Sequence, residues 1–174
     1  MLITGEHVAG NAAGAPARFD VVVELPFGWV GVRTEGALVS EISFLQHARS
    51  KPAKTGLAQR VVDQLISYCN DSSSSFQLPL AIEGSPFQKQ VWSEIARIPT
   101  GETRSYGELA LQLNASARAV GQACGDNRLP LVIPCHRVVA AAGLGGFAHR
   151  RDDSYLRIKR WLLAHEAPRE LRLT

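Results

Sequence analysis

A cysteine and a histidine stand side by side at Cys135 and His136, directly after an apolar stretch between two prolines. An unperturbed thiol has a pKa of about 8.5, so little of it is thiolate at neutral pH unless a nearby base takes its proton. His136 is a candidate for that base, and Glu166, in a C-terminal helical pattern, is a candidate to orient the imidazole. The alternative interpretation is a buried cysteine that acts as a small apolar side chain beside a structural histidine.

The other two cysteines, Cys69 and Cys124, each end an amphipathic helical pattern, which favours a structural role. Three cysteines at irregular spacing are not typical of a secreted disulfide framework. The sequence contains no CxxC pair and no Cys/His quartet at zinc-finger spacing, so we expect no metal site. It also lacks an apolar run of about 18 residues and a basic secretory start, and we expect a cytoplasmic protein without membrane contact.

Charge is distributed unequally along the 174 residues. Residues 1–85 carry 6 basic and 8 acidic side chains, whereas residues 86–174 carry 13 basic and 8 acidic ones. A basic half attached to a mildly acidic half suggests a polyanionic partner, with nucleic acid as the leading candidate, although many solvated surfaces are equally basic. The composition, 45% hydrophobic and 20% charged, is typical of globular proteins and not of disordered chains.

The first half of the sequence predicts a small sheet with one helix on it. Residues 1–18, rich in Ala and Gly, are expected to be a loose terminal segment. Short β-branched runs separated by glycine-containing turns over 19–45 indicate an antiparallel meander, and apolar residues at helical spacing over 56–69 indicate the helix. We expect a domain boundary near residue 80, which gives domains 1–80 and 81–174.

The second half predicts mostly helix. One helix is expected to begin at Ser85 and to end before Pro99, a second to be capped by Ser105 or Thr103, and a third to span 116–124. The last two, joined by a brief turn, form either a helix-turn-helix whose second member enters a DNA groove, or an ordinary helical hairpin. The apolar run Leu129 to Pro134 is expected to be strand-like and to lead into the thiol.

The run Ile133-Pro134-Cys135-His136-Arg137-Val138 resembles the signature of the O6-alkylguanine-DNA alkyltransferases, also called methylated-DNA–protein-cysteine methyltransferases. The likeness extends over residues 85–166, about half the chain, with the motifs in the family's order. The further matching motifs are Ser85-Pro86-Phe87-Gln88, Val91-Trp92, Ile98-Pro99-Thr100-Gly101-Glu102-Thr103, Ser105-Tyr106-Gly107-Glu108-Leu109-Ala110, Arg118-Ala119-Val120-Gly121, Asn127 and Trp161-Leu162-Leu163-Ala164-His165-Glu166.

The resemblance implies an α/β (α+β) fold, with a small ribonuclease-H-like N-terminal domain around an antiparallel sheet. The mostly helical C-terminal domain would hold the helix-turn-helix and the thiol. The implied function is DNA repair by direct damage reversal: an alkyl group on O6-alkylguanine, or less readily O4-alkylthymine, in double-stranded DNA moves irreversibly to Cys135 after base flipping. The implied enzyme turns over once, needs no cofactor, and acts as a monomer that could bind DNA cooperatively.

The resemblance also assigns catalytic roles. Cys135 is the alkyl acceptor, His136 accepts its proton through a water molecule, and Glu166 completes the relay. Tyr106 helps to rotate out and bind the nucleotide, and its phenol can protonate the leaving guanine. Asn127 resembles the hinge between the recognition helix and the active-site loop.

Recognition of the duplex and of the base involves further residues. Arg118 resembles the side chain that fills the gap left by the flipped base, which offsets part of the cost of flipping. The other DNA contacts are expected from Ser105, Tyr106, Ala119, Gly121 and Arg137. The substrate pocket is expected to be formed by Val138, Gly146, Phe147 and Trp92.

The segment from His149 to Tyr155 is longer and more charged than is common in the family. We hypothesise that His149, Arg150 and Arg151 touch DNA phosphate or reshape access for bulkier alkyl groups; a solvated loop is the alternative. Two rival functions are a non-catalytic sensor of alkylated DNA and a cysteine hydrolase. The sensors that share this fold replace the acceptor cysteine, and hydrolases normally place nucleophile and base far apart in sequence.

Overall fold

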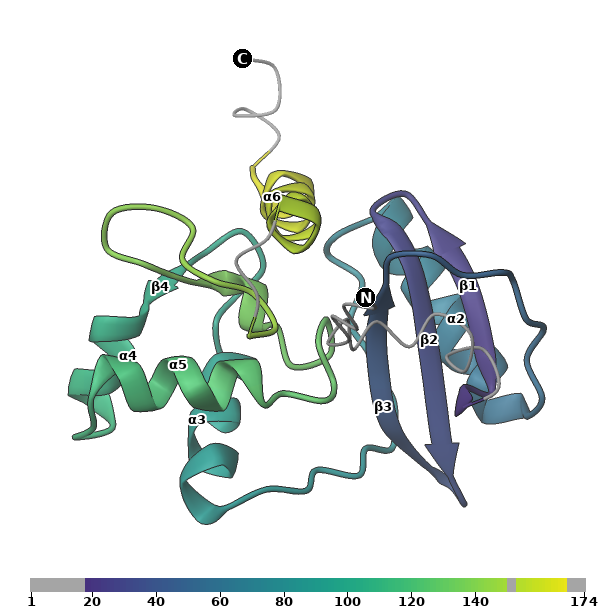
Figure 1. The fold of residues 1–174 in the computed structure, drawn as a ribbon, viewed down its shortest axis with the longest axis horizontal. Helices are drawn as coiled ribbons and strands as arrows, with labels where there is room; N and C mark the ends of the chain where they lie inside the picture. The colour runs from purple at the N-terminus through teal and green to yellow at the C-terminus, as the bar shows by residue number, and fades with distance from the viewer. Residues whose placement is uncertain (1–17, 150–152, 169–174) are drawn as a thin grey trace, which may run out of the picture.

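The computed structural model describes residues 18–149 and 153–168. Strands β1 (Val21–Leu25), β2 (Gly28–Glu35) and β3 (Leu38–Leu45) form an antiparallel sheet in the order β1-β2-β3 (Figure 1). The predicted meander is therefore confirmed. The segment expected to be loose lies, apart from Arg18, outside the described residues.

Helix α2 (Gly56–Asn70) covers one face of this sheet, as the apolar spacing predicts (Figure 1). The hydroxyl of Thr55 accepts a hydrogen bond from the backbone N–H of Ala58 and so caps the first turn. Val61 and Leu65 on the inner face of the helix are fully buried. Packing of this apolar stripe on the valine-rich sheet is the main stabilising contact of the N-terminal region.

An extended connection leads from α2 to the helical region and pairs briefly with β3. The backbone N–H of Val39 donates to Pro79, and Ala81 donates back to Val39. Helix α3 (Pro86–Ala96) then begins at a capping box in which Ser85 and Gln88 satisfy each other's backbone N–H groups.

Two short helices follow, α4 (Tyr106–Gln112) and α5 (Ala117–Gly125). The N-cap residue is Ser105 for α4 and Ser116 for α5. The side chains of Ser105 and Ser116 accept the backbone N–H three residues ahead, which satisfies donors that a helix start leaves open. A two-residue strand β4 (Arg104–Ser105) pairs in parallel with β5 (Val138–Val139), and helix α6 (Asp153–Glu166) closes the described chain.

The prediction of a strand over Leu129 to Pro134 is wrong. The segment is a tight turn, because the backbone N–H of Ile133 donates to the carbonyl of Leu129 and Leu131 has a φ of 75°. Proline cannot donate to a strand ladder, and two prolines in six residues leave too few donors for one. The turn is followed by a one-turn 3-10 helix, η1 (Cys135–Arg137), which begins at Cys135.

One continuous apolar core joins the sheet, α2 and the helices α3 to α6. The backbone N–H of Ile42 in β3 donates to the carbonyl of Arg128, 2.9 Å away, so the sheet also touches the loop before the thiol. The predicted mixed α/β arrangement with a small antiparallel sheet is confirmed. Within the described residues, no helix is long and apolar enough to cross a membrane.

Gly31, in the middle of β2, lies close against the ring of Phe19. A Cβ on this residue would lie 2.6 Å from the ring of the buried Phe19. We expect Gly31→Ala to lower the free energy of unfolding by about 1–3 kcal/mol through overpacking, measured by urea denaturation followed by tryptophan fluorescence. Gly56→Ala is the matched control, because no atom lies within 4 Å of its added Cβ. Equal midpoints for Gly31→Ala and wild type would contradict this packing.

Candidate active site

The thiol of Cys135 is buried at the start of η1, with 4% of the residue exposed. Asn127, two residues after α5, ties this turn together: its Nδ2 donates to the carbonyl of Ile133 and its Oδ1 accepts the N–H of Leu129. Burial raises the pKa of the Cys135 thiol, and contact with Asn127 and the nearby Lys159 oppose this only in part. Cys135 is therefore protonated at neutral pH in the free protein.

His136 follows the thiol and is fully buried. Its Nε2 lies 2.8 Å from Oε1 of Glu166, and its Nδ1 has no hydrogen-bond partner among the described residues. Since an ionised carboxylate only accepts hydrogen bonds, the proton of the neutral ring lies on Nε2 and Nδ1 keeps its lone pair. Burial lowers the pKa of His136 although Glu166 opposes it, so the ring is a neutral base.

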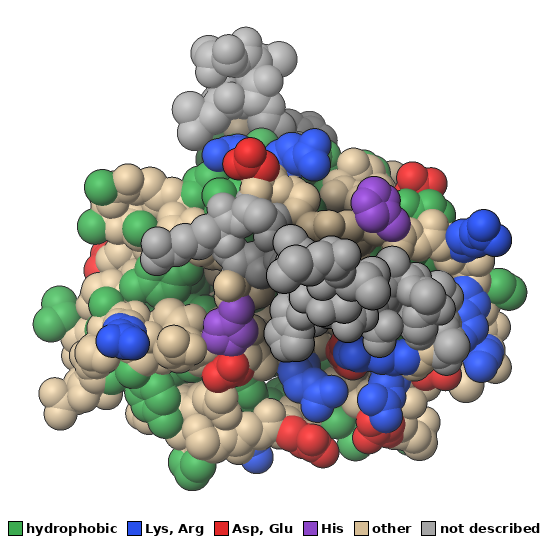
Figure 2. Space-filling model, in the orientation of Figure 1, with side chains coloured by type: hydrophobic (Ala, Val, Ile, Leu, Met, Phe, Trp, Pro, Cys, Tyr) green, Lys and Arg blue, Asp and Glu red, His purple; other side chains and the backbone are tan. Residues whose placement is uncertain are grey.

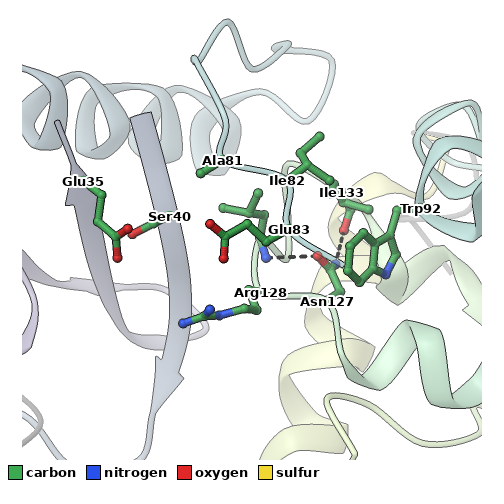
Figure 3. Close-up of a pocket in the computed structure, with 10 residues that line it drawn as sticks. Glu35, Ser40, Ala81, Ile82, Glu83, Trp92, Asn127, Arg128 and Ile133 are labelled. Atoms are coloured by element: carbon green, nitrogen blue, oxygen red, sulfur yellow. Dashed lines mark hydrogen bonds between the residues drawn. The ribbon is translucent and has the colours of Figure 1, made fainter. Parts of the chain in front are cut away.

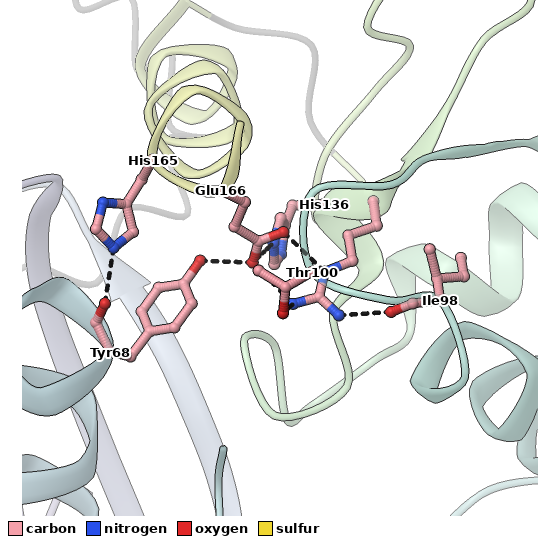
Figure 4. Close-up of polar contacts among 7 residues, drawn as sticks. Tyr68, Ile98, Thr100, His136, His165 and Glu166 are labelled. Atoms are coloured by element: carbon pink, nitrogen blue, oxygen red, sulfur yellow. Dashed lines mark hydrogen bonds and ion pairs between the residues drawn. The ribbon is translucent and has the colours of Figure 1, made fainter. Parts of the chain in front are cut away.

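Glu166, at the end of α6, is the acceptor for three side chains (Figure 4). Besides His136, Arg137 donates from Nε to Oε2 at 2.8 Å and from Nη2 to Oε1 at 2.9 Å. The phenol of Tyr68 in α2 donates to Oε1 at 2.7 Å. Helix α6 therefore meets the active-site turn and the sheet region at one buried carboxylate.

The buried carboxylate is ionised in spite of its surroundings. Burial acts to raise the pKa of Glu166, but the hydrogen bonds from His136 and Arg137 and their charges hold it far below its usual value. The same anion, together with burial, raises the pKa of Tyr68, which stays a hydrogen-bond donor at every relevant pH. Arg137 carries the positive charge that balances Glu166.

A cavity of about 740 Å³ opens beside Cys135. It lies between the starts of α4 and α5 on one side and the loop after β5 on the other. The predicted site residues that line it are Cys135, Tyr106, Arg118, Gly121, Gly146 and Phe147. Arg118 is exposed, whereas Phe147 is 4% exposed, so the cavity runs from the surface to a buried floor at the thiol.

Lys159 of α6 supports the wall of this cavity and was not predicted. It is fully buried, and its ammonium donates to the carbonyls of Val138, Leu144 and Gly146 at 2.6–2.9 Å. Burial lowers its pKa to about 8. The ammonium also lies 5.8 Å from the centre of the Tyr106 ring, and the Tyr106 hydroxyl donates to the carbonyl of Gly146. One cation therefore holds the loop and the aromatic ring in place.

Known proteins resemble this chain in sequence and in fold. Residues 86–168 match the family model described as 6-O-methylguanine DNA methyltransferase, DNA binding domain. The methylated-DNA–protein-cysteine methyltransferase of Mycobacterium tuberculosis is 36% identical over 129 residues, which is 70% of this chain and 78% of the relative. A probable methyltransferase of the same name from Acanthamoeba polyphaga mimivirus is 34% identical over 151 residues, 83% of this chain and 94% of the relative.

This chain belongs to the methylated-DNA–protein-cysteine methyltransferase family. The crystal structure of Mycobacterium tuberculosis O6-methylguanine methyltransferase superposes with a TM-score of 0.71 and 33% identity, over 87% of this chain and 96% of that one. The same Mycobacterium protein in complex with DNA superposes with a TM-score of 0.69 and 34% identity, over the same shares. The family expected from the sequence is confirmed.

Several residues that the family resemblance assigned to DNA or to the base do not line the cavity. Trp92 is buried, donates to the carbonyl of Ala123 at 2.7 Å, and lines a small pocket of about 20 Å³ between the sheet and Asn127 (Figure 3). Val138 is fully buried, and its carbonyl accepts a hydrogen bond from Lys159.

The three remaining residues predicted at the DNA are Ser105, Ala119 and Arg137. Ser105 caps α4, and Ala119 lies partly buried in the first turn of α5. The side chain of Arg137 is only 11% exposed, because its nitrogens bind Glu166, the carbonyl of Ile98 and the hydroxyl of Thr100. In this member of the methyltransferase family, the side chain of Arg137 therefore lies beside Glu166.

The surface over α4 and α5 carries few charges in the view of Figure 2, where apolar and uncharged atoms predominate. Lys and Arg side chains gather instead over the sheet side of that face. Of the charged segment predicted at the pocket rim, residues 150–152 lie outside the described residues. Among the residues that are described, no group of three or more His, Cys, Asp or Glu side chains could hold a metal ion.

Two functional residues were missed, although one left a signal in the sequence. Lys159, Leu162 and Glu166 are spaced three and four residues apart and form the buried face of α6. A lysine on an otherwise apolar face beside the predicted relay glutamate indicates a buried partner. Tyr68 left no comparable signal, because its partner lies 98 residues away in sequence.

The free energy of unfolding below neutral pH should depend on the ionised carboxylate of Glu166. Its folded pKa lies below the unfolded value of 4.5, so its contribution is present above about pH 4.5 and is lost as the pH falls below that value. We expect Glu166→Gln to be less stable than wild type by about 3 kcal/mol at pH 7, with the gap narrowing towards pH 3.

Urea denaturation at a series of pH values measures this gap. Glu24→Gln, at an exposed strand position, is the matched control and should follow the wild-type curve. Parallel curves for wild type and Glu166→Gln between pH 7 and pH 3 would contradict an ionised carboxylate at the centre of the site.

Proposed function

We propose that this protein repairs DNA by direct reversal, moving the alkyl group of O6-alkylguanine irreversibly onto Cys135. The observation that carries the proposal is the buried Cys135, which lines a cavity of about 740 Å³ and is followed in the chain by His136, whose Nδ1 has no hydrogen-bond partner among the described residues. A thiol in such a place reacts only with a group that enters the cavity. A purine base projecting from DNA is a flat aromatic group that suits this entrance.

The reaction balances without a cofactor. The sulfur of Cys135 attacks the alkyl carbon, the C–S bond forms and the bond from carbon to guanine O6 breaks. The thiol proton passes to Nδ1 of His136 through a water molecule, and the resulting imidazolium is stabilised by Glu166. Guanine leaves as a neutral base after it takes a proton from the phenol of Tyr106 on the cavity wall. The phenolate then regains a proton from the imidazolium of His136 through water, which returns both side chains to their neutral forms. The thioether is stable, so each molecule turns over once.

We propose that α4 and α5 form a helix-turn-helix and that α5 enters a DNA groove. The first turn of α5 contains small residues at Ala117 and Ala119 that allow close approach, and the exposed Arg118 stands between them at the cavity entrance. A base inside the duplex cannot reach Cys135, so it must be flipped out, which costs a few kcal/mol. Arg118 would occupy the gap and offset part of that cost.

The wider assignments are proposals of the same kind. We retain a ribonuclease-H-like domain over residues 1–80 and a DNA-binding, alkyl-accepting domain over 81–174. We also retain a monomer acting in the cytoplasm, cooperative binding to DNA, and slower action on O4-alkylthymine. Asn127 would act as the hinge, because it links the end of α5 to the turn before Cys135. Arg137 would act through Glu166 and only indirectly on DNA.

The two rival functions predict different outcomes at the thiol. A sensor of alkylated DNA needs no acceptor, whereas Cys135 is present and lies at the cavity floor. A cysteine hydrolase would release its product and recover the thiol, which would give many turnovers.

Incubation with excess duplex containing O6-methylguanine should add one methyl group, about 14 Da, to Cys135 of each molecule, because the thioether does not hydrolyse. Intact-protein and peptide mass spectrometry measure the mass and its position. Cys135→Ser should gain no methyl group, and Cys69→Ser, in α2 and outside the cavity, is the control that should behave as wild type. More than one lesion repaired per molecule would overturn the proposal.

Arg118→Ala should separate base flipping from chemistry. We expect single-turnover transfer from O6-methylguanine in a duplex to slow by at least about tenfold, since loss of the intercalated cation raises the cost of flipping. Transfer from the free base O6-benzylguanine, which needs no flipping, should keep the wild-type rate. Arg97→Ala, an exposed arginine outside the cavity, is the control. Equal slowing with both substrates would place Arg118 in the chemical step instead.

A further inference from the structure

His149 lies at the mouth of the cavity, near the end of the described part of the loop after β5. Its Nε2 donates a hydrogen bond to Oδ1 of Asp126 at 2.7 Å, and Asp126 is the C-cap residue of α5. The second carboxylate oxygen of Asp126 accepts from Gln88 of α3 at 2.8 Å. The contact between His149 and Asp126 therefore closes the loop against α5 across the rim of the cavity.

The ring of His149 fits this place because residue 125 has no side chain. A Cβ on Gly125 would lie 2.2 Å from Nδ1 of His149. Ala148 and His149 both have positive φ values, 50° and 60°, which are unfavourable for residues with a Cβ. Strained backbone concentrated at a cavity rim is typical of functional segments.

The His149 ring lies directly against Gly125 of α5, and both residues line the cavity. Gly121 and Gly145 line the cavity as well, but they face the ring of Tyr106. The His149 ring therefore narrows the part of the cavity beside Gly125. The two partners are 45% and 42% exposed, and an exposed pair of this kind is weak, so the contact can open and close readily.

We propose that the contact of His149 with Asp126 is a size gate that determines which alkyl groups reach Cys135. A methyl group on guanine O6 passes with the contact closed, whereas a benzyl group requires it to open. The inference rests on the proposed function and adds the substrate class that the site prefers, namely small alkyl groups. A direct contact of His149 with DNA phosphate is less favoured, because the carboxylate of Asp126 already occupies its Nε2 and repels an anion.

The test compares single-turnover rates on two duplexes, one with O6-methylguanine and one with O6-benzylguanine, read as the adduct on Cys135 by mass spectrometry. His149→Gly removes the ring, and Gly125→Ala displaces it without altering either partner. We expect the ratio of the benzyl rate to the methyl rate to rise by about tenfold or more in both variants. Asp126→Ala keeps the His149 ring but removes its hydrogen bond, together with the one from Gln88, and the ratio should rise by about twofold to fivefold.

Two controls separate this proposal from the function on which it rests. His47→Gly changes an exposed histidine that does not line the cavity, and its ratio should equal that of wild type. Methyl transfer by wild type with an unchanged ratio in all three gate variants would overturn the gate alone. Absence of methyl transfer to wild-type Cys135 would overturn the proposed function.

A second readout needs no transfer activity. Modification of Cys135 by iodoacetamide, a small reagent, is compared with modification by N-benzylmaleimide, a bulky one. The gate predicts that His149→Gly and Gly125→Ala accelerate the bulky reagent more than the small one. Equal acceleration of both reagents, or of neither, would contradict a size gate at this rim.

Discussion

The ionised carboxylate of Glu166 is the interaction on which the rest of the site depends. It is buried, and it is stable there only because Tyr68, His136 and Arg137 direct four donors at its two oxygens. These donors come from α2 and from the turn that begins at Cys135, so one anion holds α6, the sheet region and the active site together (Figure 4). The N-terminal region thus contributes directly to the geometry of the thiol through Tyr68.

The same anion defines the proton transfer that the proposed chemistry needs. By accepting a hydrogen bond from the N–H at Nε2 of His136, it leaves the lone pair of Nδ1 available on the side of the ring away from Glu166. Burial keeps Cys135 as a thiol in the free protein, which slows its oxidation and its reaction with electrophiles that are not positioned in the cavity. The thiol loses its proton only when an alkyl carbon is in position to receive the sulfur. The buried relay therefore explains both why the thiol of Cys135 is unreactive in the free protein and why it reacts with its substrate.

Local sequence patterns correctly predicted the features that depend on interactions between residues close in sequence, such as the starts of helices. Ser85 and Ser105 begin helices because their side chains accept N–H groups three residues ahead, and a short window of sequence contains that information. The turn at Leu129 to Pro134 was predicted as a strand because its apolar composition fits both, although its two prolines argue against a strand and Leu131 has a positive φ. Trp92, expected at the base, binds Ala123 across the helical region, and that contact depends on packing between segments far apart in sequence. The motif around Cys135 was enough to identify the family. The hydrogen-bond partners of Glu166 could be identified only from the structure.

The most direct test of the relay is the pH dependence of methyl transfer. The single-turnover rate from a saturating O6-methylguanine duplex is measured between about pH 6.5 and pH 8.5 for wild type and His136→Gln. Wild type should show a nearly flat profile, because a neutral imidazole with a lowered pKa takes the thiol proton throughout this range. His136→Gln should be slower and should gain about tenfold per pH unit, since hydroxide must then remove the proton. The same pH profile for both proteins would contradict the account.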